Sequence, residues 1–525
     1  KRKRQNGVSK EVYVEAGEGD EVKVQAGEPY LTNDKAERKA TGSYYTPDYI
    51  VQYIVEHTVR PLVREKREKF EKFAEVLRSK SDSALVKLAK SEGVDPKRPR
   101  DEIIQALLEK RDPIREILSL KVLDPAMGSG HFLVGAVDYL SDEVAEALSR
   151  LEEELDYRSP VADELEGLRQ EILKKAREFG YKIPEENLDD KNLIKRLVLK
   201  RCVYGVDINP LAVELAKVSL WLHTFTVGAP LSFLDHHLKC GNSLMGANPK
   251  EYEEAIGKSL FGARLAGLQR AIEGILTIES TPDLDLDQVE QSRRAFDEVL
   301  RELEPYKRVL DVYLAARFLP KREGKRILSL VDGTRGDPMK AVKGEAELGE
   351  EDRERLNWAL SFAREKRFFH WKLEFPEVWF GPEAKGGFDA VIGNPPYGAD
   401  IPTDEARVVR QLSETTTRDS SALFVERGLK LSRDFVGMIV PKSLAFYSNW
   451  VSIRDVILKQ GVLIRIADVG IGFEEVNYEQ IILIIGVNRQ KVVNYSYITD
   501  EFCPVKRFTM HKEVKHSGKV KYEIV

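Results

Sequence analysis

Short apolar runs rich in β-branched residues recur along the chain, and several of them end in turn residues. The runs lie at residues 122–123, 203–206, 390–392, 436–440, 462–466 and 481–485. Parallel strands that are covered by helices on both faces are apolar throughout, so near-continuous runs alternating with amphipathic helical segments indicate such a sheet. The sequence therefore predicts an α/β fold with a mostly parallel sheet.

Long charged segments with a helical pattern interrupt this series of runs. They lie at about residues 63–117, 141–200 and 247–386, and we interpret them as helical insertions in a single α/β core. The predicted organisation is an N-terminal tail or partner arm at 1–40, a core with these insertions at 41–490, and a C-terminal extension at 491–525. The last insertion ends in an aromatic cluster, which is expected to pack the insertion onto the sheet.

Composition narrows the class of protein. The 525 residues carry a net charge of −5, and 42 % of them are hydrophobic, which suffices for a buried core and excludes a disordered chain. No apolar run approaches the roughly 18 residues of a membrane span, so no membrane partner is expected. Because the chain begins with Lys1 instead of Met, we expect a fragment of a longer protein.

Cysteine and histidine usage argues against a metal site. The three cysteines lie far apart without CxxC spacing, which disfavours a disulfide scaffold and suits a reducing cytoplasm. Cys202 and Cys240 are expected to be core residues. His236 and His237 have no third ligand at metal spacing, so no metal site is predicted.

The strongest motif is Asp124-Pro-Ala-Met-Gly-Ser-Gly130, which follows a predicted strand and opens a helix. Glycines there allow a tight turn and a close approach of the backbone to a ligand beyond the carboxyl end of the strand. Alternatively, the glycines serve only the connection between strand and helix.

Asp207 ends the next predicted strand, which places an acidic side chain at the tip of a neighbouring strand. A carboxylate in this position holds the hydroxyl pair of a ribose in nucleotide-binding folds. Alternatively, Asp207 caps the helix that begins at Pro210.

Asn394-Pro395-Pro396-Tyr397 directly follows the predicted strand at 388–392. Two prolines fix the backbone, so that the Asn394 amide and the Pro395 carbonyl present two rigid acceptors beside the flat ring of Tyr397. This combination suits an amino group held between two acceptors while its ring stacks on an aromatic face. The alternative is a rigid loop with a surface tyrosine.

Together these motifs resemble the signature of S-adenosylmethionine-dependent amino-methyltransferases. Upstream, Thr41-Gly-Ser-Tyr-Tyr-Thr-Pro47 is similar to the further cofactor motif of N6-adenine DNA methyltransferases of the large restriction-modification and phage-defence type. The resemblance covers roughly residues 41–490, although the insertion at 63–117 lengthens a gap that is short in simple members. It implies a Rossmann-like class I methyltransferase fold, with seven mostly parallel strands and helices on both faces.

The resemblance also implies S-adenosylmethionine as the cofactor and assigns roles to individual residues. The implied cofactor-binding residues are Thr46, Pro47, Asp124, Ala126, Gly128, Gly130, Asp207, Ile208 and Asn242. The implied catalytic residues are Asn394, Pro395 and Tyr397, and the implied substrate-binding residues are Pro396 and Phe473. Phe473 would stack on the target base from the side opposite Tyr397, and Tyr478 is the alternative for this role.

The expected reaction is methyl transfer to the N6 amino group of an adenine flipped out of double-stranded DNA, in a restriction-modification or phage-defence system. Sequence recognition would come from a missing part of the chain or from other subunits of such a complex. Two alternatives remain open. The amino group acted on belongs to RNA or to a protein glutamine, or the chain is a cofactor-binding subunit of a defence complex.

Overall fold

The computed structural model describes residues 2–5, 8–11, 46–178, 180, 183–184, 188–257, 265–399, 401–472, 479–487, 494–497, 508–509, 514–516 and 519–521. The chain divides into two compact units, Lys1–Ala40 and Thr41–Val525. In the first unit, β1 (Arg2–Gln5) pairs with β2 (Val8–Glu11) as an antiparallel hairpin. The segment predicted to be a tail or partner arm therefore contains a hairpin.

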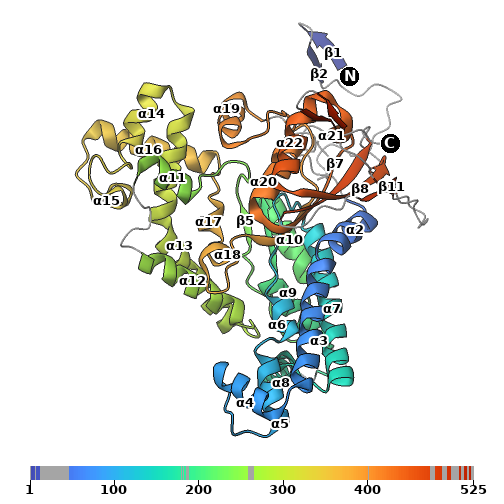
Figure 1. Ribbon diagram of the computed structural model, residues 1–525. Coiled ribbons are helices and arrows are strands. Elements are labelled where there is room, and N and C mark those ends of the chain that lie inside the picture. Colours follow the sequence, from blue (N-terminus) through green and yellow to red (C-terminus); the bar gives the residue numbers. More distant parts are fainter. Residues whose placement is uncertain are drawn as a thin grey trace, which may run out of the picture. The chain divides into compact units, whose positions relative to one another are not determined.

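The second unit is built on a mixed sheet with the strand order β11-β10-β8-β9-β7-β6-β3-β4-β5. Figure 1 labels β5, β7, β8 and β11 of this sheet. Its strands are β3 (Val122–Asp124), β4 (Val203–Asp207), β5 (Leu238–Cys240), β6 (Phe388–Gly393), β7 (Ser432–Pro441), β8 (Val462–Gly470), β9 (Gln480–Gly486), β10 (Asn494–Tyr497) and β11 (Phe508–Thr509). A separate antiparallel pair joins β12 (Val514–His516) to β13 (Lys519–Lys521).

Strand direction agrees with the prediction. The strands from β5 through β4, β3 and β6 to β7 are parallel to their neighbours, and β9 is antiparallel to both β7 and β8. These strands and β8 make up the predicted seven-stranded, mostly parallel sheet. Two short strands extend it, because β10 adds parallel to β8 and β11 adds antiparallel to β10.

Helices flank this sheet and fill the insertions. In the first half of the unit they are α2 (Asp48–Thr58), α3 (Arg60–Ser79), α4 (Asp82–Ser91), α5 (Arg100–Glu109), α6 (Pro113–Leu118), α7 (His131–Leu155), α8 (Pro160–Glu178), α9 (Asp190–Arg201), α10 (Pro210–His223) and α11 (Pro249–Ile256). Further along they are α12 (Leu265–Ser280), α13 (Leu286–Ala315), η3 (Ala316–Phe318), α14 (Lys321–Leu328), α15 (Pro338–Lys343), α16 (Glu350–Glu365), α17 (Trp371–Glu374), α18 (Pro376–Phe380), α19 (Thr403–Leu412), α20 (Ser420–Leu431), α21 (Ser443–Phe446), η4 (Ser448–Trp450) and α22 (Val451–Gln460).

The two faces of the sheet are buried in separate hydrophobic clusters, because successive strand residues point to opposite sides. Val122 and Ile482 pack with helices such as α2 and α7 in one cluster, whereas Leu123 and Ile481 pack with α20 and α22 in the other. Figure 1 shows α2 and α7 in one group of helices and α20 and α22 in another, which corresponds to the two clusters. Burial on both faces explains why the strand runs are apolar throughout.

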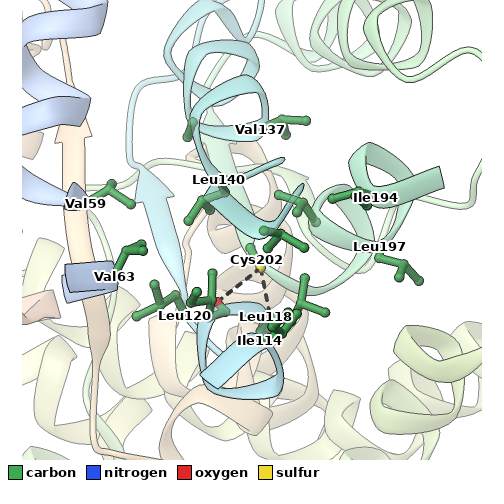
Figure 2. Close-up of a cluster of buried hydrophobic side chains, with 14 of the residues drawn as sticks. Val59, Val63, Ile114, Leu118, Leu120, Val137, Leu140, Ile194, Leu197 and Cys202 are labelled. Atoms are coloured by element: carbon green, nitrogen blue, oxygen red, sulfur yellow. Dashed lines mark hydrogen bonds between the residues drawn. The ribbon is translucent and has the colours of Figure 1, made fainter. Parts of the chain in front are cut away.

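Figure 2 shows part of the first cluster, in which side chains from α3, α6, α7 and α9 meet around Cys202. The Cys202 thiol is fully buried and lies 3.4 Å from the backbone oxygen of Leu118, to which it donates. The expectation of a core residue is confirmed for Cys202. It is wrong for Cys240, which is exposed at the end of the edge strand β5.

The aromatic cluster packs the last insertion onto the sheet, as predicted. Phe369, Trp371 and Phe375 are buried with Phe388 of β6 in the second cluster. The indole of Trp371 also donates to the backbone oxygen of Ser243 at 3.0 Å. In Figure 1 the other helices of this insertion, α11 to α16, lie together as a group to one side of the sheet. Across the part of the chain described, we find no helix with the length and apolar character of a membrane span.

Candidate active site

The predicted site residues come together at the carboxyl edge of the parallel strands. Asp124 ends β3, Asp207 ends β4, Asn242 follows β5, and Asn394 follows β6. Because β5, β4, β3 and β6 are neighbouring parallel strands, their carboxyl ends lie at one edge of the sheet. Ligands of open α/β sheets bind at this edge.

The glycine loop between β3 and α7 is fastened to the end of β4 by Asp207. One Asp207 oxygen accepts from the Gly128 N–H at 3.0 Å, and the other accepts from the Asn209 N–H at 2.8 Å. The cap of α10 is Asn209, whose side chain accepts from the Leu211 N–H at 3.0 Å. Asp207 is therefore not the helix cap, and its carboxylate instead reaches across to the loop.

Two glycines of this loop adopt left-handed backbone conformations, with φ of +54° at Gly128 and +85° at Gly130. A Cβ on Gly130 would lie 3.1 Å from the Cβ of Ala216 in α10, whereas a Cβ on Gly128 would have no atom within 4 Å. Gly130 thus permits α7 and α10 to pack closely, and Gly128 faces open space.

The two glycines should respond differently to alanine. Both substitutions meet the left-handed strain of about 1–2 kcal/mol, but only Gly130→Ala also collides with α10. We expect Gly130→Ala to lower the midpoint of thermal unfolding more than Gly128→Ala does, as measured by calorimetry on the two variants side by side. Equal losses in both variants would contradict the close packing at Gly130.

Asp124 is buried behind the loop. Its carboxyl accepts from the Ala126 N–H at 3.0 Å, and a Cβ on Gly393 would lie 2.7 Å from the same oxygen. Burial, together with the nearby Asp207 carboxylate, raises the pKa of Asp124 to about 8. Burial also raises the pKa of Asp207. At 1 % exposure, Asp124 shapes the loop from behind and is not open to solvent.

The raised pKa of Asp124 predicts a pH-dependent stability. Between the unfolded value near 4 and the folded value near 8, the folded protein holds a proton that the unfolded chain has lost. This contribution to stability is therefore full below pH 4 and declines as the pH rises to 8, by of the order of 1 kcal/mol per pH unit. Asparagine does not titrate in this range. The free energy of unfolding of Asp124→Asn, measured with denaturant, should therefore rise relative to that of the wild type from pH 5 to pH 8. Parallel stability profiles would contradict the prediction.

The upstream motif reaches the Asn-Pro-Pro-Tyr loop directly. The Asn394 amide nitrogen donates to Thr46 Oγ1 at 3.1 Å, across 348 positions of sequence. The Tyr397 hydroxyl lies 2.5 Å from Asn394 Oδ1 and 3.2 Å from the backbone oxygen of Ile439 in β7. The Tyr397 ring is half-buried against the first hydrophobic cluster. Thr46, Asn394 and Tyr397 thus form one hydrogen-bonded chain.

A further contact ties the upstream motif to the glycine loop. Pro47 is the N-cap of α2 and its carbonyl accepts from Ile50 at 3.0 Å, so the motif leads directly into this helix. Asp48 in the first turn of α2 lies 2.9 Å from Nε2 of His131, the first residue of α7. The sequence interpretation missed His131 and Asp48, although each adjoins a predicted motif.

Other predicted residues lie at the same edge. Ile208 is half exposed beyond β4, and Asn242 makes a turn in which its side-chain oxygen accepts from the Leu244 N–H at 3.2 Å. The Pro396 carbonyl accepts from Ser420 Oγ at 2.5 Å, and Pro395 is buried. Ala126 packs against a further hydrophobic cluster, which includes Leu310 of α13 in the last insertion. Phe473 and Tyr478 lie outside the described residues.

An exposed aromatic pair near this edge was missed by the sequence interpretation. Phe446 and Tyr447 follow the carboxyl end of β7, the strand beside β6, and are 56 % and 57 % exposed. Their ring centroids lie 5.2 Å apart. Two adjacent aromatic residues directly after an apolar strand are the sequence feature from which this pair could have been predicted.

The strand order, with β9 as the antiparallel strand, and the glycine loop at the end of β3 define a class I methyltransferase fold. A family model for the Eco57I restriction-modification methylase matches residues 201–473, and one for the DNA-methyltransferase domain of MmeI matches residues 102–239. The chain belongs to the Eco57I restriction-modification methylase family.

Among curated proteins, the chain is similar to one from Methanocaldococcus jannaschii named as a type II restriction enzyme and methyltransferase. The two are 27 % identical over 459 residues, which cover 80 % of this chain and 34 % of that protein. The chain thus spans about a third of the length of this relative.

Similar solved structures include the DrdV–DNA complex, with 9 % identity and a TM-score of 0.36 over 91 % of this chain and 31 % of that one. The structure of MmeI in complex with DNA has 12 % identity and a TM-score of 0.36, over 91 % of this chain and 41 % of that one. The EcoKI M protein has 12 % identity and a TM-score of 0.30, over 86 % and 65 %.

Proposed function

We propose that this chain transfers a methyl group from S-adenosylmethionine to the N6 amino group of an adenine flipped out of double-stranded DNA, within a restriction-modification system. The observation that carries the proposal is the hydrogen bond between Asn394 and Thr46. It joins the loop expected to hold the amino group to the motif expected to hold the cofactor. Recognition of a DNA sequence by other parts of such a system belongs to the same proposal.

The cofactor edge fits the proposed group. The space over Gly128 is open, the Asp207 carboxylate lies beside it, and the half-exposed Ile208 offers an apolar face beyond β4. Asp207 would hold the ribose, Ile208 and Asn242 the adenine ring, and Thr46 and Pro47 the methionine end. The bound cofactor supplies an electrophilic methyl group on a sulfonium sulfur.

Asn394 and Pro395 would hold the target amino group by accepting its two hydrogens. In the structure Asn394 Oδ1 is engaged by the Tyr397 hydroxyl, which has a second acceptor in the Ile439 carbonyl. Turning this hydroxyl toward Ile439 frees Oδ1 for the substrate. Two acceptors favour a tetrahedral and more nucleophilic nitrogen, so catalysis would consist of positioning and electrostatic stabilisation. An amide is no general base, and the proton would leave to water.

Aromatic side chains would hold the base outside the DNA duplex. Flipping costs a few kcal/mol, and stacking of the base on aromatic rings offsets part of this cost. Tyr397 would stack on one side and Phe473, or alternatively Tyr478, on the other. The exposed Phe446 and Tyr447 suit contacts with DNA near the same edge.

The decisive experiment identifies the product. The chain is incubated with S-adenosylmethionine carrying a labelled methyl group and with double-stranded DNA, RNA or protein, each alone, and the substrates are then digested. We expect label in N6-methyladenine from DNA. Label in RNA or in protein glutamine instead would contradict the proposal that DNA adenine is the substrate. Cofactor binding without transfer to any substrate, with partner subunits supplied, would indicate a cofactor-binding subunit.

A further inference from the structure

A buried polar cluster lies at the opposite edge of the sheet from the candidate active site. His237 directly precedes β5, Lys121 precedes β3, and Tyr204 lies near the start of β4, so all three belong to the amino ends of these strands. Glu279 of α12 and Glu377 of α18 reach this edge from the last insertion. The cluster therefore joins the insertion to the sheet.

The two carboxylates of the cluster differ in how they are satisfied. Glu279 Oε1 lies 3.0 Å from Lys121 Nζ, 3.1 Å from the Tyr204 hydroxyl and 3.2 Å from His237 Nε2. Glu377 is only 6 % exposed, and neither of its oxygens has a hydrogen-bond partner among the described residues. His237 Nδ1 likewise has none in that part of the chain.

The lysines near the cluster pair with other carboxylates and make no direct contact with Glu377. Lys121 neutralises Glu279, and the nearby Lys239 pairs with Glu374, which also binds Lys307 at 2.7 Å. No direct counter-ion for Glu377 remains within the described structure. Burying an unpaired carboxylate is costly, so such groups take up a proton or bind a metal ion.

We propose that His237, Glu279 and Glu377 bind a divalent transition-metal ion of the zinc class. One ligand atom from each residue lies within 4.8 Å of the others. Tetrahedral ligands at about 2.0–2.1 Å from zinc are about 3.4 Å apart, so modest side-chain rotation closes the site. Three protein ligands leave the fourth position to a water molecule.

The ion would fasten the insertion helices α12 and α18 to the sheet and would take no part in methyl transfer. Sequence spacing predicted no metal site at His236 and His237, because the two carboxylates come from helices far along the chain.

The test uses the full chain, stripped of metal with a chelator. Titration with Zn²⁺ should show one equivalent bound per chain, and Zn²⁺ should raise the midpoint of thermal unfolding by about 2 °C or more. Co²⁺ should give the visible absorption of a tetrahedral site. His237→Asn and Glu377→Gln should each weaken Zn²⁺ binding at least tenfold. Mg²⁺ should change nothing, because it prefers oxygen ligands.

Glu374→Gln is the matched control, since Glu374 is a carboxylate of the same segment that two lysines already satisfy. It should retain the zinc stoichiometry. The proposal is overturned by the absence of saturable Zn²⁺ binding to the wild type, or by unchanged binding in Glu377→Gln. It is also overturned if Zn²⁺ has no effect while Glu377→Gln stabilises the metal-free chain, since Glu377 is then a buried neutral acid.

Discussion

Asn394→Ala should reduce methyl transfer by at least about a hundredfold while changing the affinity for S-adenosylmethionine less than threefold. Removing one preorganised polar group that acts on the reacting centre typically lowers kcat about 10²–10³-fold. The Asn394 side chain contacts Thr46 and Tyr397, and not the glycine loop, in the hydrogen bonds of the structure. Single-turnover transfer and equilibrium cofactor binding, measured on the same preparation, separate the two effects.

Asn248→Ala is the control for this variant. Asn248 caps α11 by accepting from the Lys250 N–H at 3.1 Å, so its loss costs about 1 kcal/mol of stability and leaves transfer intact. If Asn394→Ala abolished cofactor binding, the two halves of the site would be wrongly assigned.

Asp207→Ala should have the converse effect and weaken S-adenosylmethionine binding by about 30- to 100-fold. Hydrogen bonds to a charged group contribute about 1.5–3 kcal/mol, and this carboxylate also holds the loop through the Gly128 N–H. At saturating cofactor concentration, the transfer rate should recover most of the wild-type value. Calorimetric titration and the dependence of the rate on cofactor concentration measure both quantities.

Asp189→Ala is the comparison for Asp207→Ala. Asp189 also accepts a backbone N–H, from Lys191 at 3.1 Å, but it caps α9 away from the loop. It should bind the cofactor with wild-type affinity. An unchanged affinity in Asp207→Ala would remove Asp207 from the cofactor site.

The sheet was predictable because strands that are buried on both faces are apolar at successive positions, as in the runs 436–440 and 481–485. Strand direction and order follow from tertiary pairing, so the sequence predicted a mostly parallel sheet without indicating that β9 is the antiparallel strand. Cys240 was misplaced because a short strand at the edge of a sheet is covered less than its neighbours.

The glycine loop and the Asn-Pro-Pro-Tyr loop were predictable, because glycine and proline determine which local backbone conformations are allowed. The contacts between them were not. Neither the hydrogen bond from Asn394 to Thr46 nor the contact of His131 with Asp48 corresponds to a local sequence spacing from which it could be predicted. The cluster of His237, Glu279 and Glu377 was not predicted for the same reason, because its residues are far apart in the sequence and meet only in the fold.

The bond between Thr46 and Asn394 also bears on when the proposed site is completed during synthesis. The glycine loop and Asp207, which accepts from its Gly128 N–H, leave the ribosome long before β6 and the loop that follows it. Chains emerge at roughly 5–20 residues per second, and contacts distant in sequence form late. A nascent chain that ends in the last insertion contains the glycine loop but lacks Asn394. The proposed methyl transfer would therefore begin only after the amino- and carboxyl-terminal parts of the core have met.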